Sequence, residues 1–148
     1  MVHLVPDNST TGNHPLIGRK GVVKRKIKKK DLRLFRRISH DDNRLHFDKD
    51  YAKTTSFKKP IAHGFLTTSL ISGAVGAKLF REDILYKTQS FHFLKPVYIG
   101  DTITATAEVV DVDGKLLTLS TYCQNQKGEY VVQGEGVIIL KNMEKYVD

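Results

Sequence analysis

The stretch SHDDNRLHFD, residues 39–48, holds two imidazoles and three carboxylates within ten positions. Asp41 and His46 are five residues apart, which is too far for neighbours on one helical turn and suits a curled loop. A carboxylate beside an imidazole can together hold a water molecule and remove its proton. Loops also use Asp, Asn and His as solvated turn formers. Taken alone, the stretch therefore leaves both interpretations open.

A second candidate group is PIAHG, residues 60–64, at the start of a long apolar segment. Amides in the first turn of a helix lack partners within that helix, and the helix dipole adds positive potential there. The N–H of Gly64 could therefore bind an oxygen that gains negative charge, such as a thioester oxygen becoming enolate-like. A glycine also leaves room for a substrate. The alternative is an ordinary helix start, with His63 either lining a pocket or serving as a hydrogen-bonded structural histidine.

The size and composition of the chain indicate the kind of protein that carries these groups. The 148 residues, 40% hydrophobic and 27% charged, are typical of one soluble globular domain. We expect a single domain over residues 1–148, with residues 1–18 as a loose N-terminal arm. The apolar run 61–77 is too short and too polar for a membrane span. The chain start lacks a secretory signal pattern.

Cysteine usage points to a reducing compartment. The lone Cys123 cannot form an internal disulfide, and no Cys/His spacing matches a zinc site. We therefore expect a cytoplasmic protein without a bound metal, in which Cys123 serves packing.

The hydrophobic pattern predicts one long helix and an antiparallel sheet. Residues 61–80 are apolar around the whole cylinder, which indicates a helix enclosed on several sides and started by Pro60. Strict alternation over residues 102–109 predicts a strand with one buried face. Residues 21–29 fit an exposed edge strand. The remaining strands are expected at 84–94, 102–111, 115–124 and 130–140. This combination predicts an α+β hotdog fold, an antiparallel sheet wrapped around one long central helix.

Three smaller features carry structural expectations. Asp31 is a candidate cap for a short helix through Arg37, with Leu32, Phe35 and Ile38 as its apolar stripe. Residues 49–55 fit one or two helical turns. Two glycines share one face of the last strand and favour close approach by the long helix; they are Gly134 and Gly136.

The net charge of +8 is concentrated near the N-terminus, where residues 19–37 carry eleven Lys/Arg against one acid, Asp31. Such a block favours an anionic partner. Nucleic acid is disfavoured, because interleaved aromatics, zinc-finger spacing and an RNP-type sequence are all missing. The alternatives are a solvated, lysine-rich surface, or a docking site for a phosphate-bearing ligand or an acidic carrier.

Three motifs in series, at residues 39–46, 60–66 and 93–102, resemble the MaoC-like (R)-specific enoyl-CoA hydratases over about residues 20–140. The resemblance implies that Asp41 and His46 act on water, that the Gly64 amide binds the thioester oxygen, and that Asn43 and Ser72 support substrate binding. It also implies no cofactor and a substrate carried as a coenzyme A or acyl carrier protein thioester. The open edge of the predicted sheet and its basic first strand suggest a homodimer. His40 and Arg44 depart from the family pattern, which usually has glycine and proline there.

The function expected from this resemblance is reversible addition of water to a trans-2-enoyl thioester, giving an (R)-3-hydroxyacyl thioester. Two alternatives stay open. One is an (R)-3-hydroxyacyl-acyl carrier protein dehydratase, which shares these residues. The other is a non-catalytic hotdog module that binds acyl-CoA, although retention of both Asp41 and His46 argues against it.

Overall fold

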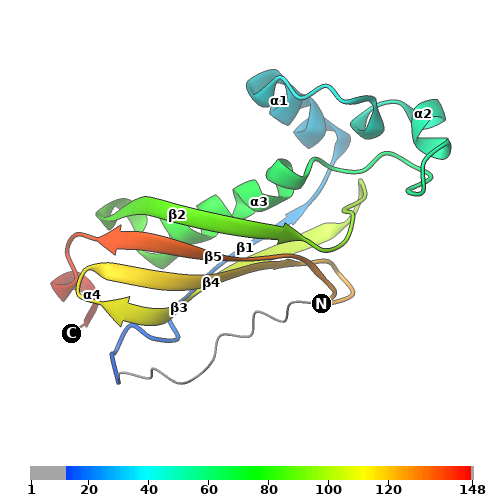
Figure 1. Cartoon of the computed structure of the whole chain (residues 1–148). Coiled ribbons are helices and arrows are strands. Elements are labelled where there is room, and N and C mark those ends of the chain that lie inside the picture. The colour runs from blue at the N-terminus through cyan, green and yellow to red at the C-terminus, as the bar shows by residue number, and fades with distance from the viewer. Residues whose placement is uncertain (1–12, 148) are drawn as a thin grey trace.

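The computed structural model describes residues 13–147 and shows a five-stranded antiparallel sheet with one long helix along it (Figure 1). The strand order is β1-β3-β4-β5-β2, so β1 and β2 are the two edges. The strands are β1 (Lys20–Lys26), β2 (Ile84–Phe93), β3 (Thr102–Asp113), β4 (Leu116–Gln124) and β5 (Tyr130–Leu140). The predicted hotdog architecture and the edge position of the first strand are confirmed.

The central helix is α3 (Gly64–Gly73), which continues without a break into a π-helical segment, η2 (Ala74–Leu79). Two short helices, α1 (Lys29–Ser39) and α2 (Lys49–Lys53), lie together beyond the end of the sheet, near the start of α3 (Figure 1). Between them is a single 3-10 turn, η1 (Arg44–His46). A second such turn, η3 (Arg81–Asp83), precedes β2, and α4 (Glu144–Val147) closes the described chain.

The core lies between the sheet and α3–η2. On β3 the alternating residues Ile103, Ala105, Ala107 and Val109 are fully buried, as the sequence pattern predicts. Cys123 on β4 is also buried, and burial raises the pKa of its thiol to about 12. A buried thiol with a raised pKa is unreactive, which agrees with the packing role expected for Cys123. Within residues 13–147, none of the helices is long and apolar enough to cross a membrane.

The long helix begins later than predicted, at Gly64 instead of Pro60. The preceding residues are extended, because Ile61 forms a bridge with Tyr98 and the Ala62 N–H donates to the Val97 carbonyl at 2.7 Å. This pairing overrides the preference of proline for a first helical turn. One side of α3 is also open, since Phe65 is 66% exposed, so the helix is less enclosed than its composition suggests.

Helix α1 begins two residues before Asp31, so Asp31 is its third residue and not its N-cap, and it caps the helix from there by accepting the N–H of the N-cap residue, Lys28. The Asp31 carboxylate accepts the Lys28 N–H at 2.9 Å and an Arg25 guanidinium N–H at 2.6 Å. The hydrogen bond from Arg25 is the main cause that lowers the pKa of Asp31. The predicted apolar stripe stops early, because Ile38 is 82% exposed.

The glycine contacts correct one further prediction. A Cβ at Gly134 would overlap the carbonyl oxygen of Ser90 on β2, and one at Gly136 would meet the Gln89 side chain. These glycines therefore admit the neighbouring strand, and not the helix. The helical layer comes closest at Gly21 on β1, where a Cβ would overlap the Ala74 carbonyl oxygen.

Part of the predicted loose arm is packed. Leu16 is 1% exposed and belongs to the core, and the Gly18 N–H donates to the Val109 carbonyl at 2.8 Å. Residues 13–18 are thus held against β3, because burying Leu16 stabilises them there. Residues 1–12 of that predicted arm lie outside the described part of the chain.

We predict that Gly21→Ala destabilises the protein, because the new methyl group meets backbone atoms of η2 that cannot move independently. Overpacking of this kind costs about 1–3 kcal/mol. Urea unfolding followed by circular dichroism measures the change. The matched control is Gly76→Ala, where the new Cβ would meet no other element of the described chain within 4 Å and helix propensity favours alanine. Equal unfolding midpoints for the two variants would contradict the close approach.

Candidate active site

The loop that follows α1 is braced by its own side chains. The Ser39 hydroxyl donates to the Phe35 carbonyl at 2.7 Å and accepts the Asp41 N–H at 3.1 Å. One oxygen of the Asp41 carboxylate accepts the Asn43 N–H at 3.2 Å, which leaves the other oxygen for a further partner. Asn43 in turn caps η1 by accepting the Leu45 N–H at 3.0 Å. These short-range contacts fix Asp41 and the turn that carries His46.

The imidazole of His46 is oriented by the segment before α3. Its Nδ1 lies 2.7 Å from the Ile61 carbonyl oxygen. Because a carbonyl oxygen can only accept, Nδ1 carries the proton and Nε2 keeps its lone pair. The free Nε2 is therefore the basic nitrogen, as general-base chemistry requires.

His63, the residue before α3, makes a similar hydrogen bond to the loop that carries Asp41 and His46. Its Nε2 lies 3.0 Å from the Asp41 carbonyl oxygen, and its ring stacks on that of His46 with centroids 3.9 Å apart. The side chain is 2% exposed, and its Nδ1 has no hydrogen-bond partner among residues 13–147. Burial is the main cause that lowers the pKa of His63. His63 is thus a neutral, hydrogen-bonded structural histidine, the second of its two predicted roles.

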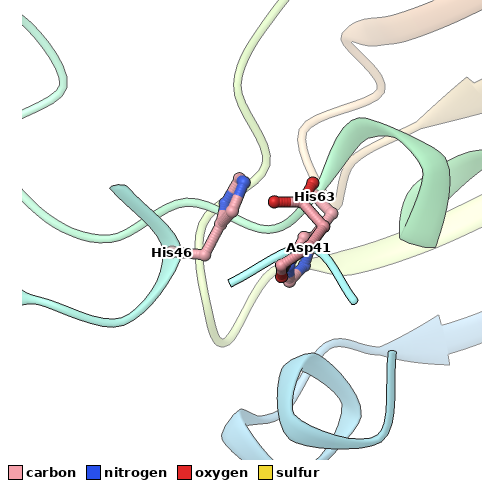
Figure 2. Close-up of side chains that lie close together, drawn as sticks. All are labelled: Asp41, His46 and His63. Carbon is pink, nitrogen blue, oxygen red and sulfur yellow. Dashed lines mark hydrogen bonds between the residues drawn. The ribbon is translucent and has the colours of Figure 1, made fainter. Parts of the chain in front are cut away.

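Asp41, His46 and His63 form one compact cluster (Figure 2). One carboxylate oxygen and one nitrogen from each imidazole all lie within 4.8 Å of one another. A single water that makes two hydrogen bonds of about 2.8 Å spans roughly 4.6 Å between its partners, so Asp41 and His46 are spaced to share one. A metal ion fits less well. The rings of His46 and His63 are nearly parallel, with 27° between their planes, so their lone pairs do not converge.

Gly64 is the first residue of α3, as predicted for an amide donor. Its N–H has no hydrogen-bond partner within the described chain, and Gly64 and His46 line the same cavity of about 380 Å³. The other lining residues are mostly apolar and include Phe57, Phe93 and Val97. A Cβ at Gly64 would lie 2.6 Å from the Phe93 ring. The absent side chain therefore accommodates Phe93, while substrate clearance stays a prediction.

Residues 12–127, which are most of the chain, match the model of the family described as "MaoC like domain". The chain belongs to the MaoC-like family. An (R)-specific enoyl-CoA hydratase of Aeromonas caviae is 37% identical over 126 residues, 84% of this chain and 94% of that protein. A mitochondrial 3-hydroxyacyl-[acyl-carrier-protein] dehydratase of Arabidopsis thaliana is 33% identical over 119 residues, 77% of this chain and 70% of that protein.

Solved structures agree with this family assignment. The (R)-hydratase from A. caviae superposes with a TM-score of 0.80 at 36% identity, covering 84% of this chain and 96% of that one. An R-hydratase from Pseudomonas aeruginosa gives a TM-score of 0.79 at 38% identity, covering 84% of this chain and 81% of that one.

The two departures from the MaoC-like pattern have local explanations. His40 ends α1 with a φ of +64°, a left-handed conformation that glycine adopts without strain. Arg44 pairs with Asp48 at 2.9 Å and lies 4.7 Å from the centre of the Tyr51 ring. The structure thus directs the Arg44 guanidinium to α2 and not to a substrate contact.

Two predicted substrate-binding residues do not line the cavity of this MaoC-like domain. The Asn43 side chain caps η1, so it positions His46. Ser72 is exposed and lines a separate depression with Tyr86 and Gln89. A direct role for either residue in binding substrate stays a prediction.

Sequence reasoning missed the way His63 supports both Asp41 and His46. Its position beside Gly64 was the only signal, and it did not distinguish a pocket residue from a structural one. Val97 and Tyr98 belong to the third motif, residues 93–102, whose sequence does not reveal their role. They hold the Ile61–Ala62 segment extended, and this contact between distant segments leaves no local pattern.

We predict that His63 makes stability depend on pH. The pKa of His63 in the folded protein lies below the ordinary 6.5. Below about pH 6.5 the unfolded chain therefore binds a proton at His63 more readily than the native protein does. Its contribution to stability is therefore present above pH 6.5 and is lost as pH falls toward the folded pKa. Urea unfolding of wild type and His63→Gln at pH 7.5 and 5.5 measures this. Wild type should lose more stability on acidification, and an equal loss in both proteins contradicts the assignment.

Proposed function

We propose that the protein is a hydro-lyase that adds water across the 2,3 double bond of a trans-2-enoyl thioester, giving an (R)-3-hydroxyacyl thioester, or runs the reverse dehydration. The observation that carries this proposal is the cluster of Asp41 and His46, which are spaced to share one water, together with the cavity that His46 and Gly64 both line. The similarity to (R)-specific enoyl-CoA hydratases supports it.

In this mechanism Asp41 and Nε2 of His46 hold the water between them. They remove one of its protons as the oxygen attacks C3, and the resulting enolate receives a proton at C2 from the same pair. The Gly64 N–H stabilises the thioester oxygen while it carries negative charge. Both hydrogens and the oxygen of water end in the product. Because the step is redox-neutral, we propose that it uses no cofactor, and we propose no metal.

Two candidate functions, an enoyl-CoA hydratase and a 3-hydroxyacyl-acyl carrier protein dehydratase, differ in the carrier of the acyl chain. We favour coenzyme A, because the hydratase of A. caviae is the more similar of the two relatives compared above. The second candidate is dehydration of an acyl carrier protein thioester, favoured by the similarity to the A. thaliana protein. Equal concentrations of crotonyl-CoA and crotonyl-acyl carrier protein separate them, and the better substrate is the one with the higher kcat/KM.

A homodimer and a cytoplasmic location are part of the proposal. Strand β2 is a sheet edge with exposed apolar side chains, including Leu85, Tyr86 and Phe93, and Phe65 on α3 is also exposed. A second copy seated on this edge would cover apolar surface and the depression that contains Ser72. We do not propose nucleic acid or a membrane as a partner.

We predict that Asp41→Asn and His46→Gln each lower kcat for crotonyl-CoA hydration by about 10²–10⁴, the usual contribution of general acid–base catalysis. Loss of the enoyl thioester absorbance measures the rate. Asp42→Asn is the matched control, since this neighbouring carboxylate is exposed and lies outside the cluster. Near-normal hydration by both active-site variants would reject the mechanism, and binding without turnover by wild type would indicate a non-catalytic module.

A further inference from the structure

A second cavity of about 360 Å³ opens on another side of His46. His46 lines both this cavity and the apolar one that contains Gly64. The second cavity differs in its charge, because four cationic side chains line it together with apolar side chains that include Leu32 and Phe47. These cations are Lys29, Arg33, Lys49 and Lys59.

The four cations converge from separate segments of the chain. Lys29 and Arg33 come from α1, Lys49 begins α2, and Lys59 precedes the extended residues before α3. The ammonium of Lys59 lies 4.6 Å from the centre of the Tyr98 ring, which gives it a defined place. Lys29 is also the first residue of the eleven-residue helix α1, so the positive end of that helix lies at the cavity.

Among residues 13–147, no carboxylate neutralises this site. None of the four cations has an ion-pair partner within residues 13–147, and no Asp or Glu lines the cavity. The nearby carboxylates are engaged elsewhere, Asp31 by Arg25 and Asp48 by Arg44. Four like charges around one cavity repel one another, and a bound anion relieves that repulsion. The alternative, a solvated lysine-rich surface, does not require that cations from separate segments line one cavity together with apolar side chains.

The charge difference orients the substrate, an inference that rests on the proposed function. The first cavity is mostly apolar, and the one Lys or Arg among its described lining residues, Lys95, is paired with Glu129, so this cavity suits the acyl end. The thioester reacts beside His46, and the rest of the substrate continues into the basic cavity. In both coenzyme A and acyl carrier protein, that part is a phosphopantetheine arm with a phosphate at its far end.

We propose that the cavity lined by Lys29, Arg33, Lys49 and Lys59 binds the phosphate end of the phosphopantetheine arm that carries the acyl chain. Cationic side chains bind phosphate through charge-assisted hydrogen bonds. The site thus serves recognition of the carrier, while the chemistry stays at Asp41 and His46.

The test compares two double variants that lower the net charge by the same amount. Arg33→Ala/Lys59→Ala removes two cations from the cavity. Lys24→Ala/Lys26→Ala removes two exposed cations of β1 that do not line it. Each is assayed with crotonyl-CoA, with crotonyl-acyl carrier protein, and with the N-acetylcysteamine thioester of crotonate, which has no phosphate. Isothermal titration with coenzyme A alone measures binding without catalysis.

For the cavity variant we expect KM for crotonyl-CoA and Kd for coenzyme A to rise about tenfold or more. Its kcat/KM for the N-acetylcysteamine thioester should match wild type, which also shows that the variant is folded. The β1 variant should bind coenzyme A like wild type. A rise in KM with both carriers supports recognition of the shared phosphate, and the carrier with the lower wild-type KM identifies its source.

Three results would overturn the proposal: an unchanged Kd for coenzyme A in the cavity variant, an equal rise in both double variants, or a rise confined to the carrier protein, which would indicate docking of its acidic surface. The proposed function fails separately, if wild type hydrates none of the three thioesters. The titration with coenzyme A still decides the cavity proposal in that case.

Discussion

Two hydrogen bonds between the loop after α1 and the start of α3 hold the site together. Nδ1–H of His46 donates to the Ile61 carbonyl at 2.7 Å, and Nε2–H of His63 donates to the Asp41 carbonyl at 3.0 Å. Each imidazole thus binds the backbone of the segment that carries the other. The pair fixes which nitrogen of His46 is basic and how far it lies from the Asp41 carboxylate. It also holds His46 at the cavity that Gly64 lines.

The extended segment before α3 makes these bonds possible. Had a helix begun at Pro60, the Ile61 carbonyl would point along the helix axis to an amide four residues later. Instead the Ala62 N–H pairs with Val97 and the Ile61 N–H lies 3.4 Å from the Leu45 carbonyl. The third sequence motif therefore acts on the site indirectly. It sets the residue at which the helix begins, and so sets the direction of the free Gly64 N–H.

The sequence was sufficient to predict the strands of the sheet, because a pattern such as the alternation along β3 is a local signal. The roles of Asp41, His46 and Gly64 follow from the resemblance of three motifs to the MaoC-like family, since the residues alone leave a solvated loop and an ordinary helix start open. The start of α3, the close approach at Gly21 and the burial of Leu16 could not be predicted, since each depends on contact between distant segments. His63 belongs with these, because only the folded chain stacks it on His46. Ser72 was assigned by resemblance alone, and in the single chain it lies outside the cavity.

Polarity across the site follows from the position of His46 between two cavities of different character. The apolar cavity reaches the helix start, and the basic one reaches α1 and α2. A substrate with one apolar end and one anionic end therefore fits the site in one orientation, with its apolar end in the first cavity and its anionic end in the second. Of the eleven cations near the N-terminus, two line the basic cavity, Lys29 and Arg33, while others, such as Lys24 and Lys26 of β1, are exposed.

The most direct measurement is a crystal structure of the protein with an (R)-3-hydroxyacyl-CoA bound. The account predicts that the 3-hydroxyl contacts both the Asp41 carboxylate and Nε2 of His46, and that the thioester oxygen lies within about 3.2 Å of the Gly64 nitrogen. A 3-hydroxyl that contacts neither side chain, or a thioester oxygen directed away from Gly64, would contradict it.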